Sequence, residues 1–210
     1  MRYFALCLVK TLPSAYCVGG WALGAVVSAS RLHRVGRGFE SLSAHHFLIM
    51  KNSGTIVLSQ LMSPSSINLN LKSTDSSGVL EELVNQISAI AKQPDARQTL
   101  LRALHEREQL HSTGIGDGVA LPHARNALVG LVDRPVIVFG RSTQGIPFGA
   151  IDGEPSKLFF LLVAPTVTEH LAVLARLSRL LRDPSVRHQL LAVSDVRKVL
   201  ALIREAEAKL

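Results

Sequence analysis

Apolar residues from about position 56 onward recur at spacings that predict alternating strands and helices. The segment 67–71 (INLNL) alternates apolar and polar residues, as a strand with one exposed face does. The runs 136–140 (VIVFG) and 158–163 (LFFLLV) are continuously apolar, which is typical of strands buried on both faces. Residues 145–153 lie between these runs and carry three glycines, so we expect a loop with short extended pieces there.

Other segments repeat apolar residues every three or four positions, as the buried side of a helix does. Polar residues before these segments indicate N-caps, namely residues 73–77 for the first helix, Thr168 for the third and Ser194 for the last. Asp183 and Pro184 are expected to stop the third helix. The predicted helices cover residues 79–91, 94 to 107–110, 169–181 and 194 to about 206.

Strands and helices alternate without an internal repeat, which indicates an α/β fold. Hydrophobic residues make up 47% of the 210 residues, enough for a buried core. We therefore expect one compact domain whose sheet is covered by helices on both faces. Residues 50–210 hold eighteen basic and fifteen acidic residues without a basic block, which argues against a nucleic-acid partner.

The segment 112–125 (STGIGDGVALPHAR) carries the chain's most distinctive candidate chemistry. Three glycines at alternate positions predict a loop before a short apolar strand. Pro122 favours an extended backbone at Leu121 and so fixes the orientation of His123. A neutral imidazole offers a lone pair to an electrophile near physiological pH. By this pattern alone, His123 is either a nucleophile or an ordinary surface or core histidine.

Known patterns for cofactor and metal sites do not occur in the chain. The glycine segment lacks the third glycine of the dinucleotide-binding fingerprint, and there is no phosphate-binding loop of the form GxxxxGK[ST]. His105 and His111 lie six positions apart, whereas a helical zinc pair needs four. Both cysteines lie in residues 1–49, so the remainder offers no thiolate ligand. We expect neither a cofactor nor a bound metal.

Three motifs occur in a distinctive order: TGIGDGVALPHAR, FGRSTQGIPFGAIDGEP and LFFLLVAP. Together they resemble the enzyme IIA domain of the mannitol/fructose class (type 2) of the bacterial phosphoenolpyruvate:sugar phosphotransferase system, most of all its nitrogen-regulatory branch. The resemblance runs from about Ile56 to the C-terminus. It implies a mannitol-type enzyme IIA domain over residues 56–210, with a mixed sheet.

The resemblance also implies roles for three residues. His123 matches the phosphoacceptor nucleophile, and His170 matches a second active-site histidine that stabilises the phosphate. Arg107, sixteen residues before His123, matches an arginine that contacts the phosphate or the partner. Phosphoryl transfer develops charge on oxygen atoms, so backbone N–H groups of the glycine segment are further candidates for stabilising it. Some members of the nitrogen-regulatory branch carry another histidine where this chain has Ala172.

Two functions follow from the resemblance. The favoured one is a regulatory phosphocarrier. It accepts a phosphoryl group from a phosphohistidine carrier, HPr or its nitrogen-branch counterpart, and signals nitrogen, potassium or carbon status to regulated target proteins. The alternative is the enzyme IIA of a fructose/mannitol-type sugar uptake system, which passes the phosphoryl group to enzyme IIB. Both imply a cytoplasmic phosphotransferase component without membrane insertion of the domain.

Residues 1–49 differ from the rest in composition and are interpreted as a basic N-terminal extension. They carry +4 of the net charge of +7. The apolar stretch at 15–29 is shorter than the roughly 20 residues that span a bilayer. Three interpretations remain open: an export signal, a disordered tail, or translated sequence upstream of a true start at Met50 or Met62. We favour the last, because the resemblance begins only after Met50 and its implied partners are cytosolic.

Overall fold

Two long strands, both rich in aliphatic and aromatic residues, form the centre of the sheet. The computed structural model describes residues 56–124 and 130–210. Strands β4 (Val136–Ile146) and β5 (Ser156–Val163) run antiparallel, with Phe139 opposite Phe160. The centroids of these two rings lie 4.9 Å apart, so the pair packs directly at the middle of the core.

Three short strands complete a mixed sheet of five strands in the order β1-β4-β5-β3-β2. Strand β1 (Ile67–Asn68) is parallel to β4, and β3 (Val119–Ala120) is parallel to β5. Strand β2 (Gly114–Gly116) is antiparallel to β3, so the two form a hairpin at one edge. The predicted α/β fold with a mixed sheet is confirmed.

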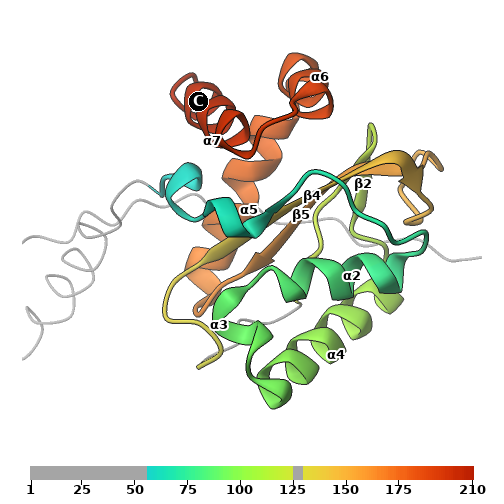
Figure 1. Ribbon diagram of the computed structural model, residues 1–210, viewed down its shortest axis with the longest axis vertical. Coiled ribbons are helices and arrows are strands. Elements are labelled where there is room, and N and C mark those ends of the chain that lie inside the picture. The colour runs from blue at the N-terminus through green and yellow to red at the C-terminus, as the bar shows by residue number, and fades with distance from the viewer. Residues whose placement is uncertain (1–55, 125–129) are drawn as a thin grey trace, which may run out of the picture. The chain divides into compact units, whose positions relative to one another are not determined.

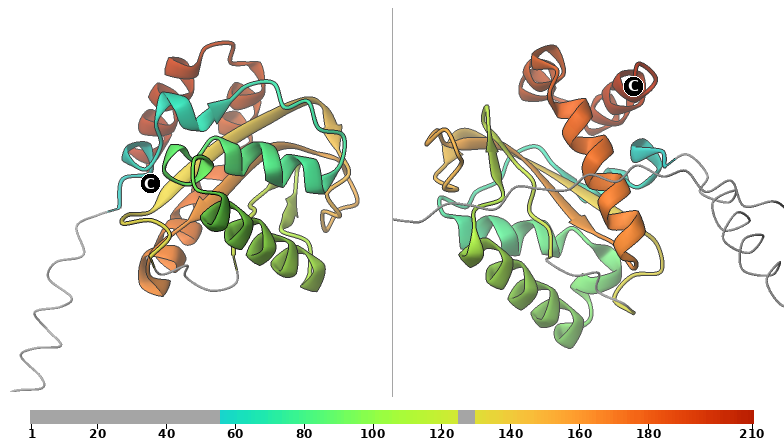
Figure 2. Two further views of the ribbon diagram at one scale, coloured as in Figure 1. Left: turned by 60° about the horizontal axis from the view of Figure 1, so that its bottom comes forward. Right: turned by 180° about the vertical axis from the view of Figure 1, so that it is seen from behind.

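Helices cover both faces of the sheet, as predicted (Figure 1). Figure 2 shows the same two layers from two further directions. The first layer consists of α2 (Ser76–Asn85), α3 (Ser88–Ala91) and α4 (Pro94–Leu110). The second consists of α5 (Val167–Leu181), α6 (Pro184–Ala192) and α7 (Val196–Glu207), together with the short 3₁₀ segments η1 (Leu58–Gln60) and η2 (Pro64–Ser66).

The side chains of β5 alternate between the two layers, which explains why this strand is apolar throughout. Leu158, Phe160 and Leu162 pack with the α5–α7 layer. Phe159, Leu161 and Val163 pack with the α2–α4 layer. All six side chains are at most 2% exposed. A strand with two buried faces has no position for a polar side chain, and this constraint produces the LFFLLV run.

Several predicted boundaries were wrong for identifiable reasons. The helix predicted over 79–91 is broken into α2 and α3, because Ile87 leaves helical geometry and is buried. Strand β1 covers only two of the residues predicted over 67–71. Pro184, predicted only to stop a helix, also begins α6 at a position where its missing N–H costs nothing.

Two predicted N-caps were also wrong. The cap of α5 is Thr166 and not Thr168, because the Thr166 hydroxyl both accepts from the N–H of Glu169 and donates to its carboxylate. The cap of α7 is Asp195 and not Ser194, since the Asp195 carboxylate accepts from the N–H of Arg197 at 2.7 Å. In both cases the residue that caps the helix lies next to or near the one predicted.

The predicted extension, residues 1–49, lies outside the described residues and stays a prediction. Within the part of the chain that the structure describes, no helix is both long enough and apolar enough to cross a membrane.

Burial at the centre of the sheet should dominate stability. We expect Leu161→Ala to lower the free energy of unfolding by about 2–5 kcal/mol, because it opens a cavity beneath the α2–α4 layer. The matched control is Leu171→Ala, the same change at a side chain that is 60% exposed, which should stay within about 0.5 kcal/mol of the wild type. Chemical denaturation followed by circular dichroism measures both. Equal losses for the two variants would contradict the assigned core.

Candidate active site

The backbone of β5 fixes the position of His123. After β3 the chain continues alongside β5, where the N–H of Leu162 donates to the Pro122 carbonyl at 2.9 Å. His123 itself forms a parallel bridge with Leu162. Because Pro122 has no N–H to donate, the segment presents one carbonyl to β5 and then turns the His123 side chain to a half-buried position. The predicted extended approach to His123 is confirmed.

One hydrogen bond determines the tautomer of the His123 ring. Its Nδ1 lies 2.7 Å from the carbonyl oxygen of Leu121. A carbonyl oxygen can only accept, so Nδ1 must carry the proton and donate. In the neutral ring the lone pair then resides on Nε2. The geometry therefore leaves Nε2 as the nucleophilic atom.

His170 lies beside His123 because the connection from β5 to α5 is short. Only three residues separate the end of β5 from the start of α5, so the first turns of α5 lie at the end of the sheet where His123 pairs with β5. The two ring centroids are 5.3 Å apart with an interplanar angle of 54°. His170 is 8% exposed, and its backbone N–H donates to the Thr166 carbonyl. Two residues separated by 47 positions thus share one site.

Arg107 approaches from the other helical layer. It lies in the last turn of α4 and is half-buried, and its Nη1 donates to the His111 carbonyl at 2.7 Å. Its positive charge is close enough to lower the pKa of His123. The structure therefore brings His123, which follows β3, beside His170 of α5, and the charge of Arg107 on α4 acts on the His123 ring.

Both histidines are held toward the neutral form. Burial is the main cause that lowers the pKa of His123 below 6.5. The hydrogen bond to Leu121 raises this pKa. Of the two neighbouring charges, that of Arg107 lowers the pKa and that of Glu108 raises it. Burial also lowers the pKa of His170, and the charge of His123 lowers it further. Neutral imidazole is the form that can act as a nucleophile.

Sequence reasoning missed Glu108 and Thr113. The Glu108 carboxylate accepts from the N–H of Thr113 at 2.8 Å and from its hydroxyl at 2.6 Å. Thr113 is 4% exposed, and its carbonyl accepts from the N–H of Leu121. The adjacency of Glu108 to Arg107 was visible in the sequence, but nothing there indicated which side chain it would meet.

The glycines do not lie where an anion at His123 could use them. Gly116 and Gly118 form the tip of the β2–β3 hairpin, and His123 follows Gly118 by five positions, roughly 16 Å of extended chain. At this tip the N–H of Asp117 already donates to the Asp152 carboxylate at 2.7 Å. The expectation that backbone N–H groups of these glycines stabilise the phosphoryl charge at His123 is therefore wrong. Gly114 belongs to β2, and a Cβ there would lie 2.8 Å from the Cα of Ala150, so close packing explains it.

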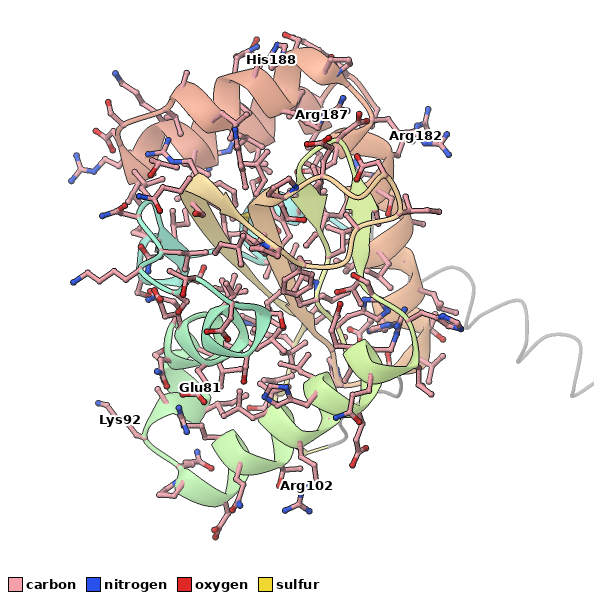
Figure 3. All side chains as sticks on the ribbon, turned by 90° about the vertical axis from the view of Figure 1, so that its right-hand side faces the viewer. Glu81, Lys92, Arg102, Arg182, Arg187 and His188 are labelled. Carbon is pink, nitrogen blue, oxygen red and sulfur yellow. The ribbon has the colours of Figure 1, made fainter. Side chains whose placement is uncertain are left out.

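The hairpin tip is instead attached to the second helical layer. Arg187 of α6 forms an ion pair with Asp117 at 3.1 Å. The same guanidinium donates to the carbonyls of Leu181 and Arg182 at the end of α5. Figure 3 shows Arg182 and Arg187 near each other on this side of the molecule. Arg187 thus connects the hairpin that leads to His123 with the helix that carries His170.

Among residues 56–124 and 130–210, no group of three or more His, Cys, Asp or Glu side chains is arranged to hold a metal ion.

A pair of neutral histidines beside an arginine, at the end of a mixed sheet, defines a site suited to carrying an anionic group. The family model described as "Phosphoenolpyruvate-dependent sugar phosphotransferase system, EIIA 2" matches residues 60–206. The chain therefore belongs to this family, and it is a phosphotransfer component of EIIA type.

Three relatives support this assignment. The chain is 35% identical over 150 residues to the fructose-specific EIIABC component of Bacillus subtilis, a match that covers 70% of this chain and 23% of that protein. The nitrogen regulatory protein IIA-Ntr from Neisseria meningitidis superimposes with a TM-score of 0.63 at 31% identity, covering 70% and 99% of the two chains. IIA mannitol from Escherichia coli gives a TM-score of 0.58 at 25% identity, covering 67% and 97%. The expected mannitol-type fold is confirmed.

The two histidines should titrate below pH 6.5 in the folded protein. The unfolded chain takes up these protons near pH 6.5 and the folded protein only at lower pH, so the free energy of unfolding should fall as pH drops below about 6.5. His123→Ala should raise the pKa of His170, because it removes a neighbouring charge. Ring chemical shifts recorded by NMR across pH 4–8 measure each pKa. Titration of both rings at or above pH 6.5 would contradict the assigned burial.

Proposed function

We propose that this protein is a phosphocarrier that accepts a phosphoryl group on Nε2 of His123. The hydrogen bond from Nδ1 to the Leu121 carbonyl carries the proposal, because it leaves the Nε2 lone pair free in the neutral ring. Membership of the EIIA type 2 family supports it, since the family's system moves phosphoryl groups between proteins. Nothing in the step needs a nucleotide in this chain.

The transfer is an in-line displacement between two imidazoles. The Nε2 lone pair of His123 forms the new N–P bond while the N–P bond of the donor phosphohistidine breaks. The electron pair of the broken bond returns to the donor nitrogen. The proton on Nδ1 of His123 stays in place, and its hydrogen bond to Leu121 stabilises the more positive ring of the product.

His170 and Arg107 are proposed to stabilise the transferred group. The transition state carries negative charge on its equatorial oxygens, so nearby donors and positive charge lower the barrier. His170 lies with its ring 5.3 Å from that of His123, close enough to donate to a phosphoryl oxygen. Arg107 brings a guanidinium, which can bind two oxygens at once.

The proposed donor is a phosphohistidine carrier protein, HPr or its nitrogen-branch counterpart. Exposed apolar side chains beside the site support docking of a protein, because such side chains are enriched in interfaces. Val167 and Leu171, 58% and 60% exposed, share one face of α5 near His170. Leu110, 52% exposed, follows Arg107 at the end of α4. These exposed side chains lie on the same helices, α5 and α4, that carry His170 and Arg107.

The favoured output is regulatory, with the phosphorylation state read by target proteins as a signal of nitrogen, potassium or carbon status. Similarity to the Neisseria IIA-Ntr protein over nearly its whole length supports this output. The alternative is transfer to an enzyme IIB in fructose/mannitol-type sugar uptake, supported by similarity to the Bacillus fructose component. Either output would place the protein in the cytoplasm with its carrier.

Labelling tests the acceptor. Incubation with phosphoenolpyruvate, enzyme I and the carrier should add one acid-labile phosphate per chain, and His123→Ala should add none. His188→Ala is the matched control and should label fully, because His188 is exposed on α6, which follows the end of α5 opposite to His170 (Figure 3). Intact-protein mass spectrometry at neutral pH measures the added mass.

Equal labelling of wild type and His123→Ala would reject the assigned acceptor. Chase of the labelled protein with purified enzyme IIB distinguishes the two outputs. Rapid loss of label to enzyme IIB would favour sugar uptake, and retention of label together with state-dependent binding of a target would favour regulation.

Removal of His170 or Arg107 should slow the transfer without abolishing it. A hydrogen bond to a charged group contributes roughly 1.5–3 kcal/mol, which corresponds to a rate lower by about 10- to 100-fold. Arg107→Ala is compared with Arg102→Ala, an exposed arginine on the same helix that points away in Figure 3 and should transfer at the wild-type rate. Arg107→Lys should recover part of the rate, because it restores charge without the planar fork.

The measurement is single-turnover transfer from the phosphorylated carrier, with circular dichroism as the check on folding. Wild-type rates in folded His170→Ala and Arg107→Ala would show that neither group contacts the transferring phosphate.

A further inference from the structure

A continuous chain of hydrogen bonds runs from α4 to the ring of His123. It begins at Glu108, whose two carboxylate oxygens accept from the N–H and the hydroxyl of Thr113. The Thr113 carbonyl accepts from the N–H of Leu121 at 3.0 Å. The Leu121 carbonyl accepts from Nδ1 of His123 at 2.7 Å. Consecutive hydrogen bonds share a residue, first Thr113 and then Leu121. A shift of the Glu108 carboxylate is therefore transmitted to the imidazole.

Water cannot easily replace these hydrogen bonds, because the two residues that they share are buried. Thr113 is 4% exposed and Leu121 is 3% exposed. A buried N–H or hydroxyl without an acceptor is costly, so Thr113 must keep both bonds to Glu108 or move. Movement of Thr113 would shift the carbonyl that holds Leu121.

We infer that Glu108 is a positioning residue for the phosphoacceptor, acting through Thr113 and Leu121 to hold His123 with Nε2 free. The inference rests on the proposed function, because it assigns a purpose to the orientation of the ring. Glu108 itself does not touch the transferred group. Its task is to fix the backbone carbonyl that selects the Nδ1–H tautomer.

The charge of Glu108 acts in the same region. Arg107 and Glu108 are consecutive residues with opposite effects on the pKa of His123, and His170 is the other titratable group beside the ring. A negative charge near the acceptor would disfavour the phosphoryl group, so charge and geometry predict opposite effects on transfer. Removal of the carboxylate charge alone would speed acceptance, whereas loss of positioning would slow it.

The test compares four variants that separate these effects. Glu108→Ala removes both acceptors of Thr113, and Glu108→Gln keeps one acceptor while it removes the charge. Thr113→Val removes the hydroxyl donor but leaves the backbone N–H in place. The matched control is Glu106→Ala, a change at an exposed glutamate on the same helix.

Two readouts are measured: the ¹⁵N chemical shifts of the His123 ring, which report the tautomer, and the single-turnover transfer rate. Wild type and Glu106→Ala should show the Nδ1–H tautomer and equal rates. Glu108→Ala should shift the ring toward the Nε2–H tautomer and slow transfer by roughly 10- to 100-fold, because a misplacement of about 1 Å can cost that much. Glu108→Gln and Thr113→Val should change the tautomer and the transfer rate in the same direction as Glu108→Ala, but by smaller amounts.

Three results would overturn the inference. They are an Nε2–H tautomer in the wild type, an unchanged tautomer and rate in folded Glu108→Ala, and faster transfer in Glu108→Gln. If Glu108→Ala does not fold, Thr113→Val and the wild-type tautomer decide. The proposed function is tested separately. If wild-type protein is phosphorylated at His123 and the Glu108 variants behave like the wild type, only the positioning role of Glu108 is rejected. If wild-type protein is not phosphorylated, the proposed phosphocarrier function is rejected.

Discussion

The hydrogen bond from Nδ1 of His123 to the Leu121 carbonyl is the interaction on which the rest of the site depends. It determines which ring nitrogen keeps a lone pair, and it does so with a backbone atom whose position the sheet fixes. Pro122, the bridge to Leu162 and the contact from Thr113 all hold the same few residues. A side-chain acceptor would have its own rotamers, whereas a carbonyl in a paired segment has none.

The fold makes the site by bringing both helical layers to one end of the sheet. The α5–α7 layer contributes His170, and the α2–α4 layer contributes Arg107 and Glu108. At the far end of the β2–β3 hairpin, Arg187 connects Asp117 with the end of α5. Arg187 therefore connects the two segments that carry the histidines at the end away from the rings.

Sequence reasoning predicted the long elements because burial on two faces, or on one side of a helix, leaves a clear period. The glycine-rich segment and Pro122 singled out His123 as a candidate nucleophile, and the resemblance to the family then assigned it as the phosphoacceptor. Sequence reasoning failed where the deciding contacts are tertiary. The glycines were predicted near an anion, but the antiparallel turn of β2 onto β3 carries Gly116 away from His123. Glu108 was missed because its partner, Thr113, becomes recognisable only when α4 ends beside the sheet. The site roles of His170 and Arg107 were inferred from the resemblance to the family and not from the spacing of residues.

The central claim, that Nε2 of His123 carries the phosphoryl group while Nδ1 keeps its proton, is tested most directly by NMR of the phosphorylated protein with ¹⁵N-labelled histidine. The account predicts phosphorus coupling to Nε2 of His123 and a protonated Nδ1 still hydrogen-bonded to the Leu121 carbonyl. Coupling to Nδ1, or phosphate on any other residue, would contradict it.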